Sequence, residues 1–134
     1  MRADALIGPL ADTIELPNFT QFKNESVSFL NHFSVTSPCG PARASLLTGQ
    51  YAMNHRSVRN GTPLAHDTSN LATSLNSKGI EPLLYGYTDT SQDPRMYEQG
   101  DPILTSYEEV LNGFTEAQEM RFDTNKSWKD YLRE

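Results

Sequence analysis

The segment around the only cysteine, Cys39, constrains this chain of 134 residues most strongly. Pro41 suits the first position of a helix, because its missing N–H would be unpaired there, and Gly49 suits a left-handed stop just past the end. This spacing predicts a helix with Cys39 one residue ahead of its cap, where free N–H groups and a positive dipole end attract anions. Arg43 opposes the dipole in the predicted first turn, so we expect it to hold an anion.

Charge and length exclude several classes of protein. The net charge is −6, from 17 acidic and 11 basic residues, and no basic run is present that would follow a phosphate backbone, so we expect no nucleic acid partner. A lone cysteine forms no internal disulfide, and the first residues resemble neither a signal peptide nor a membrane span. We therefore expect a cytoplasmic protein without membrane contact. Residues 1–134 fit one domain, and no internal boundary is predicted.

The first third of the chain predicts loop, a short helix and a strand. Residues 1–17 are rich in turn formers and predict loop with one turn of helix. Asn18 suits the cap of a short helix with Phe19 and Phe22 on its apolar face. Apolar residues alternate with polar ones over residues 27–35, which predicts a half-buried strand leading to Cys39.

The remainder predicts an α/β arrangement. Residues 51–67 form a long polar segment of the kind that is often functional. Asn70 or Ser69 caps a helix with Leu71 and Leu75 on one face and Lys78-Gly79 as its stop, and residues 83–87 predict a buried strand. Ligands of open α/β sheets bind beyond the carboxyl ends of strands, which here means residues 88–95. Weaker patterns predict a helical turn over residues 107–111 and a final helix capped by Ser127.

Cys39 has three interpretations from the residues alone. It can be a buried, inert thiol, or a thiolate nucleophile favoured by the helix end and Arg43. A nucleophile needs a partner base, and the sequence does not assign one among its histidines, which are His32, His55 and His66. The third interpretation is a modification site, which the residues around Cys39 favour over the other two.

Residues 39–43, Cys-Gly-Pro-Ala-Arg, followed by Leu-Thr-Gly at 47–49, resemble the sulfatase signature, in which the cysteine is oxidised to formylglycine. Ala42 stands where most sulfatases have serine. Residues 53–64, 85–90 and 93–95 resemble the phosphonate monoester hydrolase and phosphodiesterase branch of the alkaline phosphatase superfamily. The resemblance covers roughly residues 2–134. It implies an α/β fold, as part of a three-layer α/β/α sandwich that lacks its first strand.

The resemblance also implies a mechanism and a partner. Formylglycine made from Cys39 by a formylglycine-generating enzyme is hydrated, and one of its hydroxyls, bound to a divalent Mn or Ca ion, attacks phosphorus or sulfur. The second hydroxyl then expels the product and restores the aldehyde. The implied activity is hydrolysis of small anionic esters, namely phosphonate monoesters, phosphodiesters or sulfate esters.

The resemblance also assigns roles to individual residues of this sequence, by their positions in the family's motifs. The resemblance implies that Arg43 holds the modified residue and offsets charge in the transition state. It implies that Asn60 contacts the substrate oxyanion or the metal-bound oxygens. Tyr87, with Thr88 or Thr90, would line the pocket.

Parts of the family pattern lie outside this sequence. Arg2-Ala3-Asp4 matches the end of the family's first element, so the resemblance implies that the first strand and its acidic metal ligands are absent from this sequence. Family members are several times longer, so we expect a later Asp-His or Asp-Asn ligand pair to lie outside it as well. The chain thus resembles an N-terminal fragment, which we expect to be inactive and marginally folded or self-associating by itself. For the full-length proteins of the family we expect oligomers. The alternative function is a non-catalytic α/β module that serves in anion binding, through Arg43, or in interaction with a partner.

Overall fold

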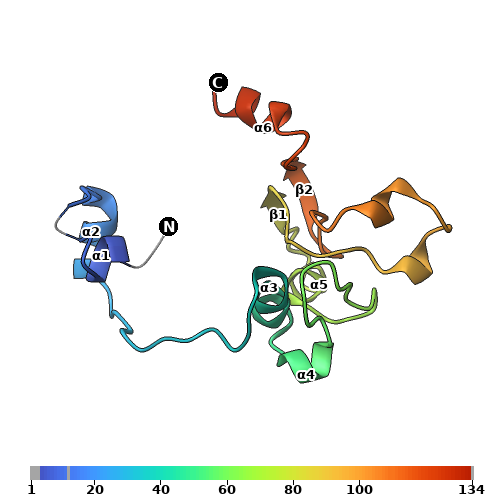
Figure 1. Ribbon diagram of the computed structural model, residues 1–134, viewed down its shortest axis with the longest axis horizontal. Helices are drawn as coiled ribbons and strands as arrows, with labels where there is room; N and C mark the ends of the chain where they lie inside the picture. The colour runs from blue at the N-terminus through green and yellow to red at the C-terminus, as the bar shows by residue number, and fades with distance from the viewer. Residues whose placement is uncertain (1–3, 12, 134) are drawn as a thin grey trace. The chain divides into compact units, whose positions relative to one another are not determined.

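The computed structural model describes residues 4–11 and 13–133, which separate into two compact units, residues 1–33 and 34–134 (Figure 1). The described residues combine short helices with a parallel two-stranded sheet, as the α/β prediction requires. The match of Arg2 and Ala3 to the family's first element lies outside the described residues. That residues 1–134 form one domain stays a prediction.

The first unit contains two helices, α1 (Asp4–Ile7) and α2 (Pro17–Asn24). The single turn of α1 confirms the prediction for residues 1–17. The predicted cap at Asn18 is wrong, because α2 begins at Pro17, whose missing N–H has no partner in a first turn anyway. The two helices are joined by Lys23, whose ammonium group donates to the carbonyl oxygen of Leu6 over 2.8 Å.

The strand predicted for residues 27–35 is wrong. The segment has no regular structure, and its apolar side chains are exposed, with Phe29 at 78%. A strand is stabilised by backbone pairing with a neighbour. None of the described strands pairs with residues 27–35, so the alternation alone does not make a strand there.

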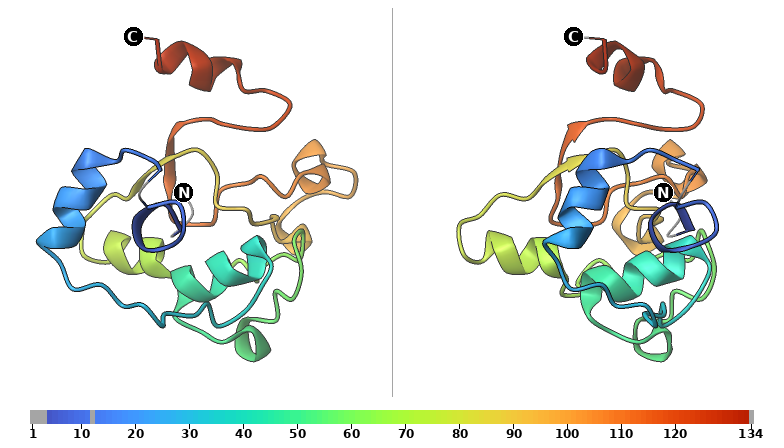
Figure 2. Two further views of the ribbon diagram at one scale, coloured as in Figure 1. Left: turned by 60° about the vertical axis from the view of Figure 1, so that its left-hand side comes forward. Right: turned by 90° about the vertical axis from the view of Figure 1, so that its left-hand side faces the viewer.

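The second unit contains three helices close together, α3 (Cys39–Thr48), α4 (Ala52–His55) and α5 (Leu71–Asn76). Helix α3 contacts both α4 and α5 (Figures 1 and 2). The predicted stop at Gly49 is confirmed, with φ of +68°. The predicted start is wrong by two residues, because the helix already includes Cys39, and Arg43 therefore lies in its second turn.

The cap of α5 confirms Asn70. Its side-chain oxygen accepts from the backbone N–H groups of Ala72 and Thr73 at 2.9 and 3.1 Å, and the Thr73 hydroxyl accepts from the Asn70 N–H at 2.9 Å. The amide group of Asn70 also donates to the carbonyl oxygen of Asn112 at 3.0 Å. The residue that α5 buries is Ala72, whereas the predicted Leu71 is exposed.

The sheet pairs β1 (Leu83–Tyr85) with β2 (Thr115–Gln118) in parallel. The predicted strand is confirmed in position but not in burial, since Leu83 and Tyr85 are both more than half exposed. The short, polar β2 carries no strand pattern and was not predicted. Helix α6 (Lys126–Tyr131) follows β2 and begins one residue before the predicted cap, Ser127.

Residues 86–114 connect the two strands. They contain two short 3₁₀ helices, η1 (Pro94–Met96) and η2 (Pro102–Thr105), and an antiparallel bridge between Thr90 and Glu109. The helical turn predicted over 107–111 is therefore wrong, because the segment is extended and pairs with Thr90.

No described helix has the length and apolar character needed to cross a membrane.

The hydrophobic core of the second unit is small. It packs α3 against the segment before α5 and the segment between β1 and β2. It consists of Ala44, Leu64 and Leu111, with Leu47 and Phe114 packed against them.

Asn70→Ala is expected to lower the free energy of unfolding by about 2 kcal/mol, because the variant removes the cap of α5 and leaves the Asn112 carbonyl without its donor. Urea unfolding followed by circular dichroism measures the change. Ser74→Ala, on the exposed side of the same helix, is the control and should change stability by less than about 0.5 kcal/mol. An equal loss in both variants would contradict the role of the cap.

Candidate functional site

Asn60 binds the first turn of α3 with both ends of its amide. The side-chain oxygen accepts from the Gly40 N–H at 2.9 Å, and the side-chain nitrogen donates to the Cys39 sulfur at 3.1 Å. Only this orientation of the amide satisfies both contacts, because an N–H faces the oxygen. Asn60 therefore holds a donor directly against the reactive atom of Cys39, whose thiol is exposed.

Gly40 allows two loops to reach this helix end. A Cβ atom at position 40 would lie 2.9 Å from the Asn60 side-chain oxygen and 3.2 Å from the carbonyl oxygen of Asp89. Both separations are shorter than ordinary contacts. A side chain at position 40 would thus displace the loops that carry Asn60 and Asp89.

The backbone donors at the start of α3 are largely engaged. The Gly40 N–H is bound to Asn60, Pro41 has no N–H, and the Ala42 N–H donates to the Pro38 carbonyl at 3.1 Å. The expectation of free N–H groups at this helix end is therefore wrong for Gly40 and Ala42. An anion at this site has to be held mainly by side chains and by the positive helix end.

Arg43 is the basic residue of α3. Cys39 and Arg43 are four residues apart, so their side chains lie on one face of the helix. The guanidinium lies over the ring of Tyr87, 5.7 Å from its centroid, and 4.0 Å from the carboxylate of Asp89. The side chain is still 45% exposed, so an incoming anion can reach it.

The loop after β1 supplies Tyr87 and Asp89. Burial raises the pKa of the Tyr87 phenol, and the carboxylates of Glu108 and Asp89 raise it further, so the phenol stays neutral at pH 7. A neutral, half-buried ring beneath a guanidinium restricts where that guanidinium can lie. The site therefore lies beyond the carboxyl end of β1, where the sequence predicted it.

The hydroxyls of Thr88 and Thr90 bond to each other and to the backbone of residues 109–111. Their hydroxyls are 2.8 Å apart and buried, and the Thr88 hydroxyl donates to the Glu109 carbonyl at 2.9 Å and accepts from the Leu111 N–H at 2.8 Å. These bonds attach the loop after β1 to residues 109–111. The predicted contact of Thr88 or Thr90 with substrate stays a prediction.

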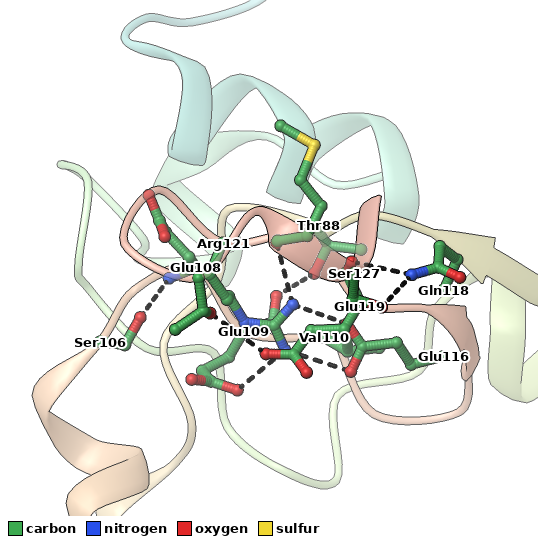
Figure 3. A network of polar contacts seen from close by, with 12 residues as sticks. Thr88, Ser106, Glu108, Glu109, Val110, Glu116, Gln118, Glu119, Arg121 and Ser127 are labelled. Atoms are coloured by element: carbon green, nitrogen blue, oxygen red, sulfur yellow. Dashed lines mark hydrogen bonds and ion pairs between the residues drawn. The ribbon is translucent and has the colours of Figure 1, made fainter. Parts of the chain in front are cut away.

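Glu109 forms in turn an ion pair with Arg121 (Figure 3). Arg121 binds both carboxylate oxygens of Glu116 on β2, at 2.6 and 3.1 Å, and lies 3.7 Å from Glu109. The hydrogen bonds to Glu116 raise the pKa of Arg121, so the guanidinium stays charged. Burial raises the pKa of Glu109, an effect that Arg121 opposes. This network ties the loop of the site to β2.

His55 does not contact Cys39. Its Nδ1 accepts from the Ser57 N–H at 3.1 Å, so the proton lies on Nε2, which donates to the Ser45 hydroxyl at 2.8 Å. Burial lowers the pKa of His55, which keeps the ring neutral at pH 7. His55 therefore fastens α4 to α3.

Asp93 shapes the end of the connection after β1. Its carboxylate binds the Arg95 guanidinium and caps η1 through the Arg95 N–H at 3.0 Å. It also accepts from the His66 N–H at 2.9 Å. The Arg95 guanidinium, followed by the His66 N–H, holds the pKa of Asp93 well below its usual range.

The described residues do not form a metal site by themselves. Within residues 4–11 and 13–133, no three His, Cys, Asp or Glu side chains converge as metal ligands.

The structure brings together Cys39, Arg43, Asn60 and Tyr87. Sequence reasoning missed Gly40 and Asp89. A signal for Asp89 was present, since it lies in the loop that follows an apolar strand, where ligands of α/β sheets bind. A signal for Gly40 was its place beside Cys39 in the signature, which predicts a close approach of another backbone.

The comparisons with known proteins identify the family. The Sulfatase family model matches residues 4–128. The multifunctional alkaline phosphatase superfamily protein PehA of Trinickia caryophylli is 45% identical over 101 residues, which are 75% of this chain and 20% of that protein. An N-acetylglucosamine-6-O-sulfatase of Bacteroides thetaiotaomicron is 23% identical over 96 residues, or 72% of this chain and 17% of that protein.

Solved structures resemble the whole chain. The phosphonate monoester hydrolase SpPMH of Silicibacter pomeroyi is 58% identical, with a TM-score of 0.89 over 99% of this chain and 26% of its own. The phosphonate monoester hydrolase of Agrobacterium radiobacter is 42% identical, with a TM-score of 0.83 over 98% and 26%. The chain thus spans about a sixth to a quarter of the length of these relatives and has an alkaline-phosphatase-like fold. It belongs to the sulfatase family, in the branch that contains the phosphonate monoester hydrolases.

Proposed function

We propose that this chain is the nucleophile-bearing part of the catalytic domain of a hydrolase that cleaves phosphonate monoesters, phosphodiesters or sulfate esters. The observation that carries the proposal is the contact of the Asn60 amide with Cys39, one helical turn from the exposed Arg43. Family membership and the two hydrolase structures support it.

Cys39 is the proposed modification site. Its thiol is exposed in the first turn of α3 and lies within the signature that precedes Leu47-Thr48-Gly49. A formylglycine-generating enzyme is the partner that converts it. The hydrated aldehyde supplies a hydroxyl as the attacking group. Asn60 then donates to an oxygen on the modified residue, as it donates to sulfur in the thiol form.

Arg43 is the proposed anion-binding residue. It shares a face of α3 with Cys39, so a phosphoryl or sulfuryl group bound by its guanidinium lies next to position 39. The ring of Tyr87 limits the movement of the guanidinium, which favours one position of the bound group. A fixed positive charge of this kind stabilises the charge that develops on the oxygens during attack.

The divalent metal of the family is assigned only in part. Residue 39, once modified, is the ligand that this chain would contribute, and the described residues provide no group that would hold the ion without others. The remaining ligands would then come from other parts of the complete enzyme.

Coexpression with a formylglycine-generating enzyme is expected to convert Cys39 to an aldehyde. Mass spectrometry of the proteolytic peptide that contains residue 39 measures the conversion, and a hydrazide probe labels the aldehyde. Cys39→Ala should remain unlabelled. Ala42→Ser, which restores the serine that most sulfatases carry, should be converted to the same extent. A free thiol at Cys39 in every preparation would overturn the proposed function.

Arg43→Ala is expected to lower kcat/KM for an aryl phosphonate monoester by about 100-fold, because the variant removes the charge that faces the developing oxyanion. The measurement uses the protein expressed from its complete reading frame and loaded with metal. Arg133→Ala, an exposed arginine near the end of the chain, is the charge-matched control and should leave kcat/KM unchanged. An equal effect of both substitutions would exclude a specific role of Arg43.

A further inference from the structure

Asp89 is a buried acid whose carboxylate lies beside the proposed anion-binding residue. It is 5% exposed, and one carboxylate oxygen lies 4.0 Å from the Arg43 guanidinium. Acidic side chains are rarely buried to this degree unless they are paired. The roles proposed for Cys39, Asn60 and Arg43 make no use of this carboxylate.

The backbone places Asp89 in a specific position. Its φ of +64° lies in the left-handed region, which is uncommon for a residue other than glycine. The neighbours on both sides are fixed, because Thr88 and Thr90 are bonded to Glu109 through backbone and hydroxyl groups. The carboxylate of Asp89 reaches α3 instead. Its position is therefore built by the fold and does not result from a freely rotating side chain.

The charge of Asp89 bears on which anions the site can accept. A carboxylate 4.0 Å from a guanidinium cancels much of its field at the position where a substrate anion would lie. Glu108 is a second buried acid whose charge acts on Tyr87. Each further negative charge on a bound group is therefore repelled by Asp89 while it is attracted by Arg43.

We propose that Asp89 is a specificity-determining residue that favours esters with one negative charge on the reacting group over phosphate monoesters with two. Phosphonate monoesters, phosphodiesters and sulfate esters carry a single charge, so this inference rests on the proposed function and deepens it. Arg43 attracts both kinds of substrate, and Asp89 makes the site unfavourable for the second charge.

Anion binding to the metal-free protein tests this role without catalysis. The protein is expressed from its complete reading frame, and calorimetry measures the dissociation constants of dimethyl phosphate, a monoanion, and inorganic sulfate, a dianion. Asp89→Asn keeps the size of the side chain and tolerates the positive φ. It is expected to improve sulfate binding relative to dimethyl phosphate by about tenfold, because one repulsive charge near the anion is lost.

Two further variants make the result specific. Asp67→Asn removes the charge of an exposed acid of the same unit and should leave the ratio of the two dissociation constants unchanged. Asp89→Gly also removes the carboxylate and suits the positive φ, so it should shift the ratio in the same direction even where the asparagine variant folds poorly.

The role of Asp89 is overturned if the ratio of the two dissociation constants is the same in the parent protein, Asp89→Asn and Asp89→Gly. It is also overturned if the parent protein binds neither anion. The proposed function fails on a different result, which is an unmodified thiol at Cys39 after coexpression. The two failures are thus distinguishable.

Discussion

The contact of Asn60 with the start of α3 is the interaction on which the rest of the site depends. A helix beginning at Cys39 leaves its first N–H groups without partners inside the helix, and Pro38 at the cap position offers no side-chain acceptor. Asn60 supplies the missing acceptor from a distant loop and binds Gly40. The same amide necessarily turns its N–H toward Cys39. One side chain thereby caps the helix and places a donor at the side chain of residue 39, where the hydroxyl of the proposed formylglycine would replace the sulfur.

A second set of contacts positions the loop after β1 against α3. The loop after β1 carries Tyr87 and Asp89 toward α3, while Thr88 and Thr90 turn the other way and bind residues 109–111. Arg121 then connects Glu109 to β2 (Figure 3). Because buried hydroxyls and charges in these contacts have partners, the loop is held by polar bonds where the apolar core is small. Hydrogen bonds and ion pairs therefore hold the loop that carries Tyr87 and Asp89.

Much of the local structure could be predicted from the sequence. Gly49 ends α3 because glycine adopts positive φ without strain, and Asn70 caps α5 because its oxygen bonds the next free N–H groups. Predictions that depended on a partner failed. The alternation of residues 27–35 matched a strand, yet the segment pairs with no described strand, whereas the polar β2 forms because β1 lies beside it. The burial expected for Leu83 and Tyr85 is likewise absent, since burial depends on what covers a strand.

The sequence by itself determined the signature segment around Cys39 and the family, because Cys39, Pro41 and Arg43 are recognised by their spacing along one helix. Only the tertiary structure decided which distant residues meet that helix. Asn60 is twenty-one residues from Cys39 and reaches its sulfur, and Asp89 comes within ion-pair distance of Arg43. Neither contact follows from a local pattern, because each arises where two connections converge on Gly40, the position that leaves room for both.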